Sequence, residues 1–398
     1  MKTKYLALAG AIFLVGLDLL FFILDWAPSG IKLAVPLSGR KFPGHFVAEG
    51  HAWHENAKSK HTVTVVARKI APKTTGSNTE KTVTKEAPRD AVRDKGKILY
   101  LLNSFHALFD LEGDGEWRVT AILKDESRKE VIRKSHDITI QRGIPNREFR
   151  TFSEEHLIPA LMVLLACIAV GVYFRKEPSS KARAITEATI VLILFTNETI
   201  YHIYWYVTDG WVPSSGLLIQ MCGLSILMLI TVFYVESPRV KNLMYDLIFF
   251  WGLGGALQAI LAPDIGARGF PDFKYFSFFI SHGFIMIGAS YIVAAHRYRP
   301  TLKALLKVAI ITNLLVIVSY GFNILLEKVP PFERGNYFIT GYPPPTGSIV
   351  DLFARTFGPS PRYLIGLEIM GLAVFLLLWA PFGIRNVRNS RRGISGKT

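Results

Sequence analysis

The sequence predicts a polytopic α-helical membrane protein of about eight transmembrane helices with an inserted extracytoplasmic β-sandwich domain. Of the 398 residues, 50% are hydrophobic, and they are gathered into blocks. Each block is about twenty residues long, the length needed to cross ~30 Å of hydrocarbon. Basic residues fall in alternate connections between the blocks, and one long connection shows the alternating pattern of β-strands. These three observations indicate the fold class.

Eight segments are apolar and long enough to be transmembrane helices. They are residues 5–26, 156–174, 184–206, 215–234, 242–262, 275–295, 302–325 and 363–382. Lys and Arg cluster before the first segment, after the last and in every second loop. The positive-inside rule therefore places both termini in the cytoplasm of a multi-pass cell-membrane protein. The net charge of +15 reflects this topology and attraction to anionic lipid, so no nucleic-acid partner is expected.

The chain divides into five parts along this pattern. They are a signal-anchor helix (1–26), a β-sandwich domain (27–155), the second transmembrane helix with a cytoplasmic linker (156–183), a six-helix membrane core (184–382) and a basic cytoplasmic tail (383–398). The first apolar run is longer than that of a cleaved signal peptide, and no small-x-small cleavage site follows it. Asp18 lies within this run, so its helix is expected to pack an acidic face against a neighbour.

The exported domain is predicted to be a small immunoglobulin-like β-sandwich. Residues 61–66, 117–123 and 137–141 alternate polar with apolar side chains, as strands with one buried face do. Residues 50–53 followed by 62–66 resemble an opening hairpin, and the polar stretch 69–97 is expected to be a flexible loop. Such a domain suits docking of an extracytoplasmic protein partner.

Four histidines stand at the start of this domain, and the chain has two cysteines. The histidines His45, His51, His54 and His61 lack a Cys or paired carboxylate at recurring ligand spacing, so no metal is expected there. Both cysteines, Cys167 and Cys222, fall in predicted spans, so no disulfide is expected in the exported domain.

Polar side chains within the predicted spans gather toward the outer leaflet. The set is Glu198, His202, Cys222, Gln258, His282, Asn323 and Glu368, whereas Asp246 and Asn313 lie toward the cytoplasmic side. Because polar and ionisable groups in lipid normally face a partner or a water-filled space, we expect a polar cavity that opens to the outer face.

Cys222 and His282 are the strongest candidates for chemistry in this set. They lie at about equal depth, ~10 Å from the outer surface, in two spans that cross in the same direction. A thiol attacks as the thiolate and needs a base within hydrogen-bond reach. A buried cysteine is more often a small apolar filler, so the agreement in depth is what favours a catalytic pair.

A family resemblance covers the second half of the chain. It is carried by LLIQMCGLS (217–225), FWGLGGALQAILAPD (250–264), FFISHG (278–283), Asn336-Tyr337 and GPSPRY (358–363). Residues 184–382 thereby resemble the YwaF family of bacterial integral membrane proteins and its animal relatives, which act as ether-phospholipid acyltransferases. The resemblance implies that Cys222 carries an acyl group and that His282 is its base. The residues just before Cys222 depart from the family pattern, and the first two spans and the β domain lie outside it.

The leading expectation is a lipid acyltransferase or acyl hydrolase that forms a thioester on Cys222. Its partner is a membrane phospholipid of the outer leaflet, and no soluble cofactor is expected. Gln258 or Asn323 is expected to donate to the developing oxyanion, and Glu198 or Glu368 to orient an imidazole.

Two other functions stay open on the sequence. One is a non-catalytic membrane subunit or assembly factor whose β-sandwich docks an extracytoplasmic partner. The other is metal binding by the intramembrane ligand types Glu198, His202, Cys222, His282 and Glu368. A transporter is less expected, since the spans show no inverted repeat.

Overall fold

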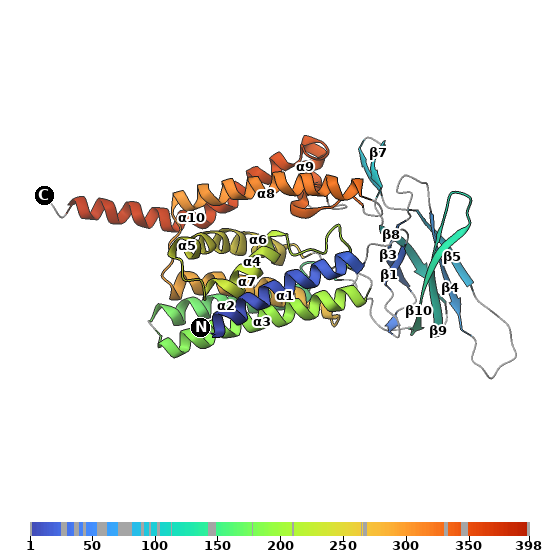
Figure 1. Cartoon of the computed structure of the whole chain (residues 1–398), viewed down its shortest axis with the longest axis horizontal. Helices are drawn as coiled ribbons and strands as arrows, with labels where there is room; N and C mark the ends of the chain where they lie inside the picture. The colour runs from blue at the N-terminus through green and yellow to red at the C-terminus, as the bar shows by residue number, and fades with distance from the viewer. Residues whose placement is uncertain are drawn as a thin grey trace.

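The structure is a computed structural model in which a helical bundle and a β domain lie end to end (Figure 1). It describes residues 2–24, 30–35, 40–42, 45–53, 62–70, 82–88, 91–94, 97–101, 104–112, 114–141, 149–176, 178–208, 211–263, 265, 269–329, 333–343 and 349–395. Of the four domain histidines, His54 and His61 lie outside these residues.

The bundle consists of helices that are mostly long and apolar. They are α1 (Lys2–Leu24), α2 (Glu154–Arg175), α3 (Ser180–Val207), α4 (Met221–Val232), α5 (Pro238–Leu247), the π-helix η1 (Ile248–Leu253), α6 (Gly254–Leu261), α7 (Phe273–Ala295), α8 (Leu302–Lys328), the 3-10 helix η2 (Tyr337–Ile339), α9 (Ile349–Phe357) and α10 (Leu364–Ser395). The elements α5, η1 and α6 form one continuous span. In the described part of the chain, seven such segments are long and apolar enough to cross a membrane, which confirms the polytopic helical class.

The fourth expected span differs from its prediction. Only Met221–Val232 is a helix, and residues 211–220 before it are irregular chain that includes a turn in which the Gly216 amide donates to the Val212 carbonyl at 2.7 Å. Leu, Ile and Met around position 220 gave the whole segment an apolar composition, and composition alone cannot locate the start of a helix. The span is therefore half helix and half irregular chain.

The β domain consists of two packed sheets and a short ribbon. The strands are β1 (Gly30–Val35), β2 (Lys41–Phe42), β3 (His45–Trp53), β4 (Thr62–Lys69), β5 (Thr82–Pro88), β6 (Ala91–Asp94), β7 (Lys97–Leu101), β8 (Ser104–Asp110), β9 (Gly115–Lys124) and β10 (Glu130–Ile140). One sheet has the order β1-β3-β8, the other β2-β10-β9-β4-β5, and β6 pairs with β7.

Strict alternation of side chains accounts for the core between the two sheets. Along β9, Trp117, Val119, Ala121 and Leu123 are all 0% exposed, and they meet apolar residues of β3 and β8 from the other sheet. Period-two burial of this kind fixes the register of a strand, because a shift by one residue would turn the apolar side chains to solvent. The β domain is confirmed, and its immunoglobulin-like class stays a prediction.

Two expectations for the β domain are wrong. The residues expected to form an opening hairpin lie in different sheets, since β3 pairs with β1 and β8 whereas β4 pairs with β5 and β9. The polar stretch 69–97 was expected to be a flexible loop, but its described part contains strands β5 and β6, and β5 pairs with β4 along its length. Residues 71–81, 89–90 and 95–96 of this stretch lie outside the described residues. Edge strands with polar side chains resemble loops in composition, so the pattern did not reveal them.

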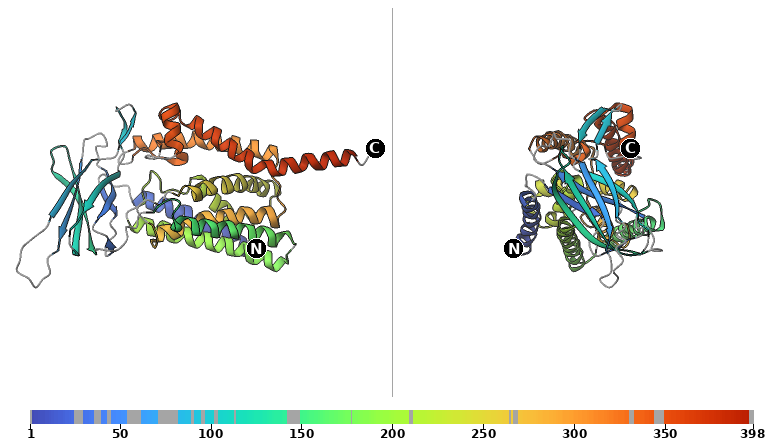
Figure 2. Two further views of the ribbon diagram at one scale, coloured as in Figure 1. Left: turned by 180° about the vertical axis from the view of Figure 1, so that it is seen from behind. Right: turned by 90° about the vertical axis from the view of Figure 1, so that its right-hand side faces the viewer.

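The β domain is fastened to one end of the bundle. Lys32 Nζ of β1 donates a hydrogen bond to the Trp211 carbonyl at 2.8 Å, and Arg40 forms an ion pair with Asp272 at 3.5 Å. Helix α1 begins and α10 ends at the opposite end of the bundle (Figures 1 and 2). Both helices therefore have their free ends on the same side, far from the β domain.

Candidate functional site

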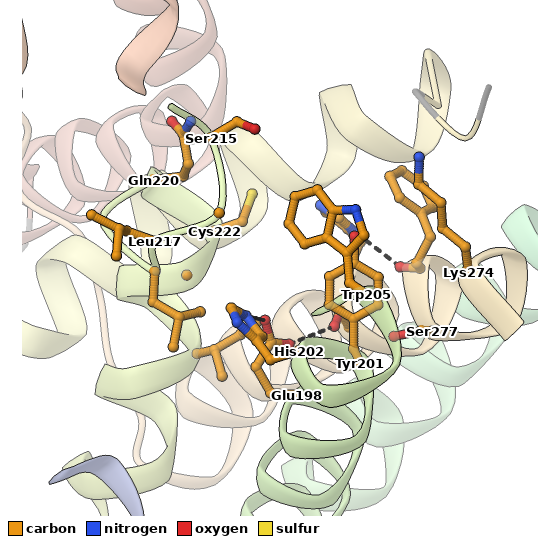
Figure 3. A pocket seen from close by; sticks show the side chains of 17 residues that line it. Glu198, Tyr201, His202, Trp205, Ser215, Leu217, Gln220, Cys222, Lys274 and Ser277 are labelled. Atoms are coloured by element: carbon orange, nitrogen blue, oxygen red, sulfur yellow. Dashed lines mark hydrogen bonds and ion pairs between the residues drawn. The ribbon is translucent and has the colours of Figure 1, made fainter. Parts of the chain in front are cut away.

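A cavity of about 170 Å³ lies at the β-domain end of the bundle, between α3, the start of α4 and the start of α7. Its polar and aromatic lining residues are Glu198, Tyr201, His202, Trp205, Ser215, Gln220, Cys222, Lys274, Ser277, Phe278, Ser281 and His282. Figure 3 shows Glu198 and His202 on α3 and Cys222 at the start of α4 around this space. The structure thus brings Cys222 and His282 to one cavity, together with the two α3 residues expected beside them.

Cys222 owes its position to the break in the fourth span. Helix α4 begins at Met221, so Cys222 lies in the first turn, where backbone N–H groups have no partner within the helix. A Cβ on Gly223 would lie 2.7 Å from the Leu218 carbonyl oxygen, so glycine lets the incoming chain pass across this turn. Irregular backbone at membrane depth occurs where it is enclosed by protein or lines a cavity. The break therefore exposes a helix N-terminus and a thiol to the same space.

A second loop, residues 333–343 after α8, holds the irregular chain 211–220 in place. The Tyr337 hydroxyl donates to the Pro213 carbonyl at 2.6 Å and accepts from the Leu217 amide at 3.1 Å. Burial is the main cause that raises the pKa of Tyr337 above its ordinary value, so the hydroxyl keeps the proton that it donates. Gln220 Oε1 accepts from the Phe338 amide at 2.8 Å.

Asn323 of α8 anchors this second loop and does not line the cavity. Its Nδ2 donates to the Tyr337 carbonyl at 3.0 Å and to Thr340 Oγ1 at 2.8 Å, and its Oδ1 accepts from the Tyr337 amide at 3.1 Å. All three of these hydrogen bonds of the Asn323 side chain are therefore made to the second loop. The structure thus places Asn323 in a supporting position, away from any developing oxyanion in the cavity.

One ring nitrogen of His282, Nδ1, is hydrogen-bonded to its own helix, and the other, Nε2, is available as a base. Nδ1 lies 2.9 Å from the Phe278 carbonyl oxygen, one turn earlier on α7. Because a carbonyl oxygen only accepts, Nδ1 carries the hydrogen, and Nε2 of the neutral ring keeps its lone pair. The ring also packs against the Phe278 ring in a tilted contact, with centroids 4.3 Å apart. This arrangement fixes the tautomer that a general base requires.

A buried chain of polar groups backs the cavity. His202 Nδ1 lies 2.7 Å from Asp18 Oδ1 of α1, at ion-pair distance but off the angle of a hydrogen bond, and His202 Nε2 lies 3.3 Å from Glu198 Oε1. Ser281 Oγ donates to Glu198 Oε2 at 3.1 Å and accepts from Asn197 Nδ2 at 2.8 Å. Three ionisable groups from α1 and α3 thus lie together inside the bundle.

Gln258 and Glu368, both expected in the cavity, lie elsewhere. Gln258 Nε2 donates to the Gly254 carbonyl of its own helix at 2.9 Å. Glu368 accepts from Asn313 Nδ2 at 3.0 Å where α10 packs against α8. The sequence can indicate which face of a helix a residue lies on, but the neighbour that this face meets depends on packing. Gln258 and Glu368 were therefore placed at the depth of the cavity without belonging to it.

Two contributors were not predicted as site residues. Asp18 was expected only to pack against a neighbour, and Tyr337 was noted only within a motif. An acidic residue in an otherwise apolar helix was the available signal for Asp18. Nothing in the local pattern signals Tyr337, because the partners of its hydroxyl are more than a hundred residues away in sequence.

The cavity supplies no ligand set for the metal hypothesis. Within the described ranges, no group of three or more His, Cys, Asp or Glu side chains is arranged to hold a metal ion. Cys167, the second cysteine, is on α2, packs against the apolar core and is absent from the cavity lining.

The family model of the TMEM164 family matches residues 151–379, more than half of the chain. The chain belongs to the TMEM164 family. The matched segment includes every residue that lines the cavity, and it leaves out α1 and the β domain. The match places the chain in a family of membrane proteins and specifies no reaction.

The other comparisons add no functional information. No curated protein matches the chain. Among solved structures, a crystal structure of an engineered protein is 13% identical with a TM-score of 0.19. The alignment covers 29% of this chain and 21% of that chain, so this TMEM164 protein spans about a fifth of its length. A likeness of this size carries no argument about fold or function.

Proposed function

We propose that this TMEM164 protein is a membrane-embedded lipid acyltransferase or acyl hydrolase that uses Cys222 as nucleophile and His282 as base. The observation that carries the proposal is that both side chains line one cavity, with His282 held in the tautomer that leaves Nε2 basic. The resemblance of residues 184–382 to ether-phospholipid acyltransferases supports the same chemistry.

Location and size of the cavity favour a lipid substrate. With both termini in the cytoplasm, as the basic loops predict, the β-domain end lies outside and the cavity lies in the outer leaflet. A volume of about 170 Å³ is below the 300–1,000 Å³ of typical small-molecule pockets, so it suits an ester group whose chains stay in the bilayer. Cytosolic acyl-CoA would not reach such a site, and the acyl donor is therefore a membrane phospholipid.

The first half-reaction transfers the acyl group to sulfur. The Cys222 thiol gives its proton to His282 Nε2, and the sulfur attacks the ester carbonyl carbon. The bond between the acyl carbon and the glycerol oxygen then breaks, and the leaving alkoxide takes the proton back from His282. Backbone N–H groups in the first turn of α4 are suited to hold the transient oxyanion.

The second half-reaction releases the acyl group. A lysolipid hydroxyl or water gives its proton to His282 Nε2 while its oxygen attacks the thioester carbonyl. The carbon–sulfur bond breaks, and the thiolate recovers the proton from His282. The choice between transfer and hydrolysis thus depends on which hydroxyl reaches the cavity.

Acyl-thioester trapping on the full chain in lipid nanodiscs tests the proposal. A phospholipid with an alkyne-tagged acyl chain should place a hydroxylamine-sensitive label on the wild-type protein. Cys222→Ala should abolish the label, and His282→Gln should slow its formation about 100-fold or more. Cys167→Ala is the matched control and should label like the wild type.

Absence of label on the wild type, or undiminished label on Cys222→Ala, would contradict the proposal. Stable copurification of other subunits, with full function after both substitutions, would instead favour a scaffold role.

A further inference from the structure

Asp18 is the one acidic residue of α1, and it lies on the buried side of this helix with Leu14 and Phe21, whereas most of the helix surface is exposed. Leu6, Ile12 and Leu19 of α1 are at least half exposed, whereas Asp18 is 3% exposed. A carboxylate in a membrane span is normally retained because it has a partner or a function. Asp18 also lies outside the segment matched by the TMEM164 family model.

Both oxygens of Asp18 reach elements that form the cavity. Oδ2 accepts from the Leu218 amide at 2.8 Å, within the irregular chain that leads into α4. Oδ1 lies 2.7 Å from Nδ1 of His202, which lines the cavity. Helix α1 thereby contacts the site at two residues: Leu218, four residues before Cys222, and His202 on α3.

The surroundings of His202 favour a doubly protonated ring. Its two ring nitrogens face carboxylate oxygens, Nδ1 that of Asp18 and Nε2 that of Glu198. An imidazolium is attracted to both carboxylates, because it donates from Nε2 to Glu198 and forms an ion pair with Asp18. A neutral ring would leave a nitrogen lone pair facing one of the two carboxylates, which would repel it. His202 is then unable to act as a base, in contrast to His282.

The charge of His202 matters because Glu198 lines the same cavity as Cys222. A lone carboxylate there would repel the thiolate and the oxyanion, and a low-dielectric site strengthens that repulsion. The imidazolium between Asp18 and Glu198 offsets the charge of Glu198 in the wall of the cavity, and the charge that remains is on Asp18, which does not line the cavity.

We propose that Asp18 is a positioning residue that keeps His202 charged and so keeps Glu198 from opposing an anion on Cys222. This role rests on the proposed function for its purpose in catalysis. The cavity of this chain is accordingly completed by a helix outside the family-matched segment.

The test measures how fast N-ethylmaleimide, an uncharged reagent, alkylates Cys222. The full chain is used in nanodiscs on a Cys167→Ala background, so that Cys222 is the only thiol. Asp18→Asn keeps an oxygen for the Leu218 amide but turns an NH₂ toward His202. We expect alkylation to slow about tenfold, because the thiolate is the reactive form. His202→Gln should slow it by a similar factor.

The double substitution distinguishes positioning from simple packing. If both residues act through one imidazolium, the double variant should be no slower than the slower single variant. The proposal would be overturned if the two substitutions slowed alkylation independently, so that their factors multiplied in the double variant. It would also be overturned if Asp18→Asn alkylated at the wild-type rate and only unfolded at a lower temperature. Asp246→Asn is the matched control, a buried intramembrane aspartate at the other end of the bundle, and it should alkylate like the wild type.

Two further measurements keep the outcome decisive. If Asp18→Asn does not fold, His202→Gln alone decides, and an unchanged rate there sinks the idea. In acyl labelling, both variants should lower the maximal rate and leave the lipid concentration for half-maximal labelling unchanged. Alkylation by N-ethylmaleimide does not depend on acyl transfer. If the proposed acyltransferase function is wrong, the wild type will not be acyl-labelled, but the alkylation rates of the variants will still differ as expected.

Discussion

The two ends of the helical bundle bury the same kinds of side chain in different ways. At the end away from the β domain, Asp246 accepts from Tyr298 Oη at 2.7 Å and Lys307 Nζ at 2.6 Å, which ties α5 to helix α8 and to the short connection between α7 and α8. At the β-domain end, Asp18 and Tyr337 instead hold irregular backbone around a cavity.

The difference indicates where function lies. Glu187, also far from the β domain, accepts from Tyr291 Oη at 2.8 Å and His296 Nε2 at 3.0 Å, so its polar contacts join two helices. Such contacts fix helix packing. Contacts that hold unwound chain beside a thiol fix the geometry of a site, and the two classes should respond differently to substitution.

The largest difference is expected between two asparagines on α8. Asn323→Leu leaves the Tyr337 amide without an acceptor and takes one donor from the Tyr337 carbonyl and one from the Thr340 hydroxyl, which keep the bond between them. One unpaired buried amide and two further lost hydrogen bonds are destabilising, so we expect a loss of about 2–4 kcal/mol in the free energy of unfolding. SDS-induced unfolding measures this, and acyl labelling should fall with it.

Asn313→Leu is the matched substitution on the same helix. Asn313 is exposed and bonds to the Ala309 carbonyl and Glu368. We expect a change below about 1 kcal/mol and normal labelling. Equal losses for the two variants would remove the distinction between loop anchoring and helix packing.

An intermediate effect is expected from two glycines. Gly223→Ala brings a Cβ within 2.7 Å of the Leu218 carbonyl oxygen, and Gly321→Ala on α8 meets nothing within 4 Å. Gly223→Ala should cost about 1–3 kcal/mol and slow Cys222 alkylation or labelling. Gly321→Ala should stabilise its helix by about 0.5–1 kcal/mol. Normal labelling by Gly223→Ala would show that the tight turn is not needed for the site.

The smallest effect is expected where the β domain meets α7. Arg40 is 38% exposed and lies 3.5 Å from Asp272, so Arg40→Ala should change stability by less than about 1 kcal/mol. Acyl labelling should be unchanged, because Asp272 is already held by Tyr204 Oη at 3.0 Å. A labelling defect in this variant would extend the site into the β domain.

Sequence alone located the class and seven of the eight expected spans, because these depend on length and apolar composition. It placed Asn313 and Glu368 at different depths, yet their side chains are hydrogen-bonded. It brought Cys222 and His282 to one level and Glu198 beside His202. It could not tell that Gln258 turns back on its own helix or that Glu368 meets Asn313, because these depend on side-chain rotamers and neighbouring helices. The start of α4 at Met221 was not predicted either, because apolar composition alone does not locate the first residue of a helix.

The bond between Asp18 and the Leu218 amide has a consequence for biogenesis, since its partners are 200 residues apart in the chain. The bond from Lys32 to Trp211 spans 179 residues. During synthesis the first helix and the β domain emerge long before their partners. Both must stay undocked until α3 and the approach to α4 have been made. Assembly of this pocket is therefore a late event in the maturation of the polypeptide.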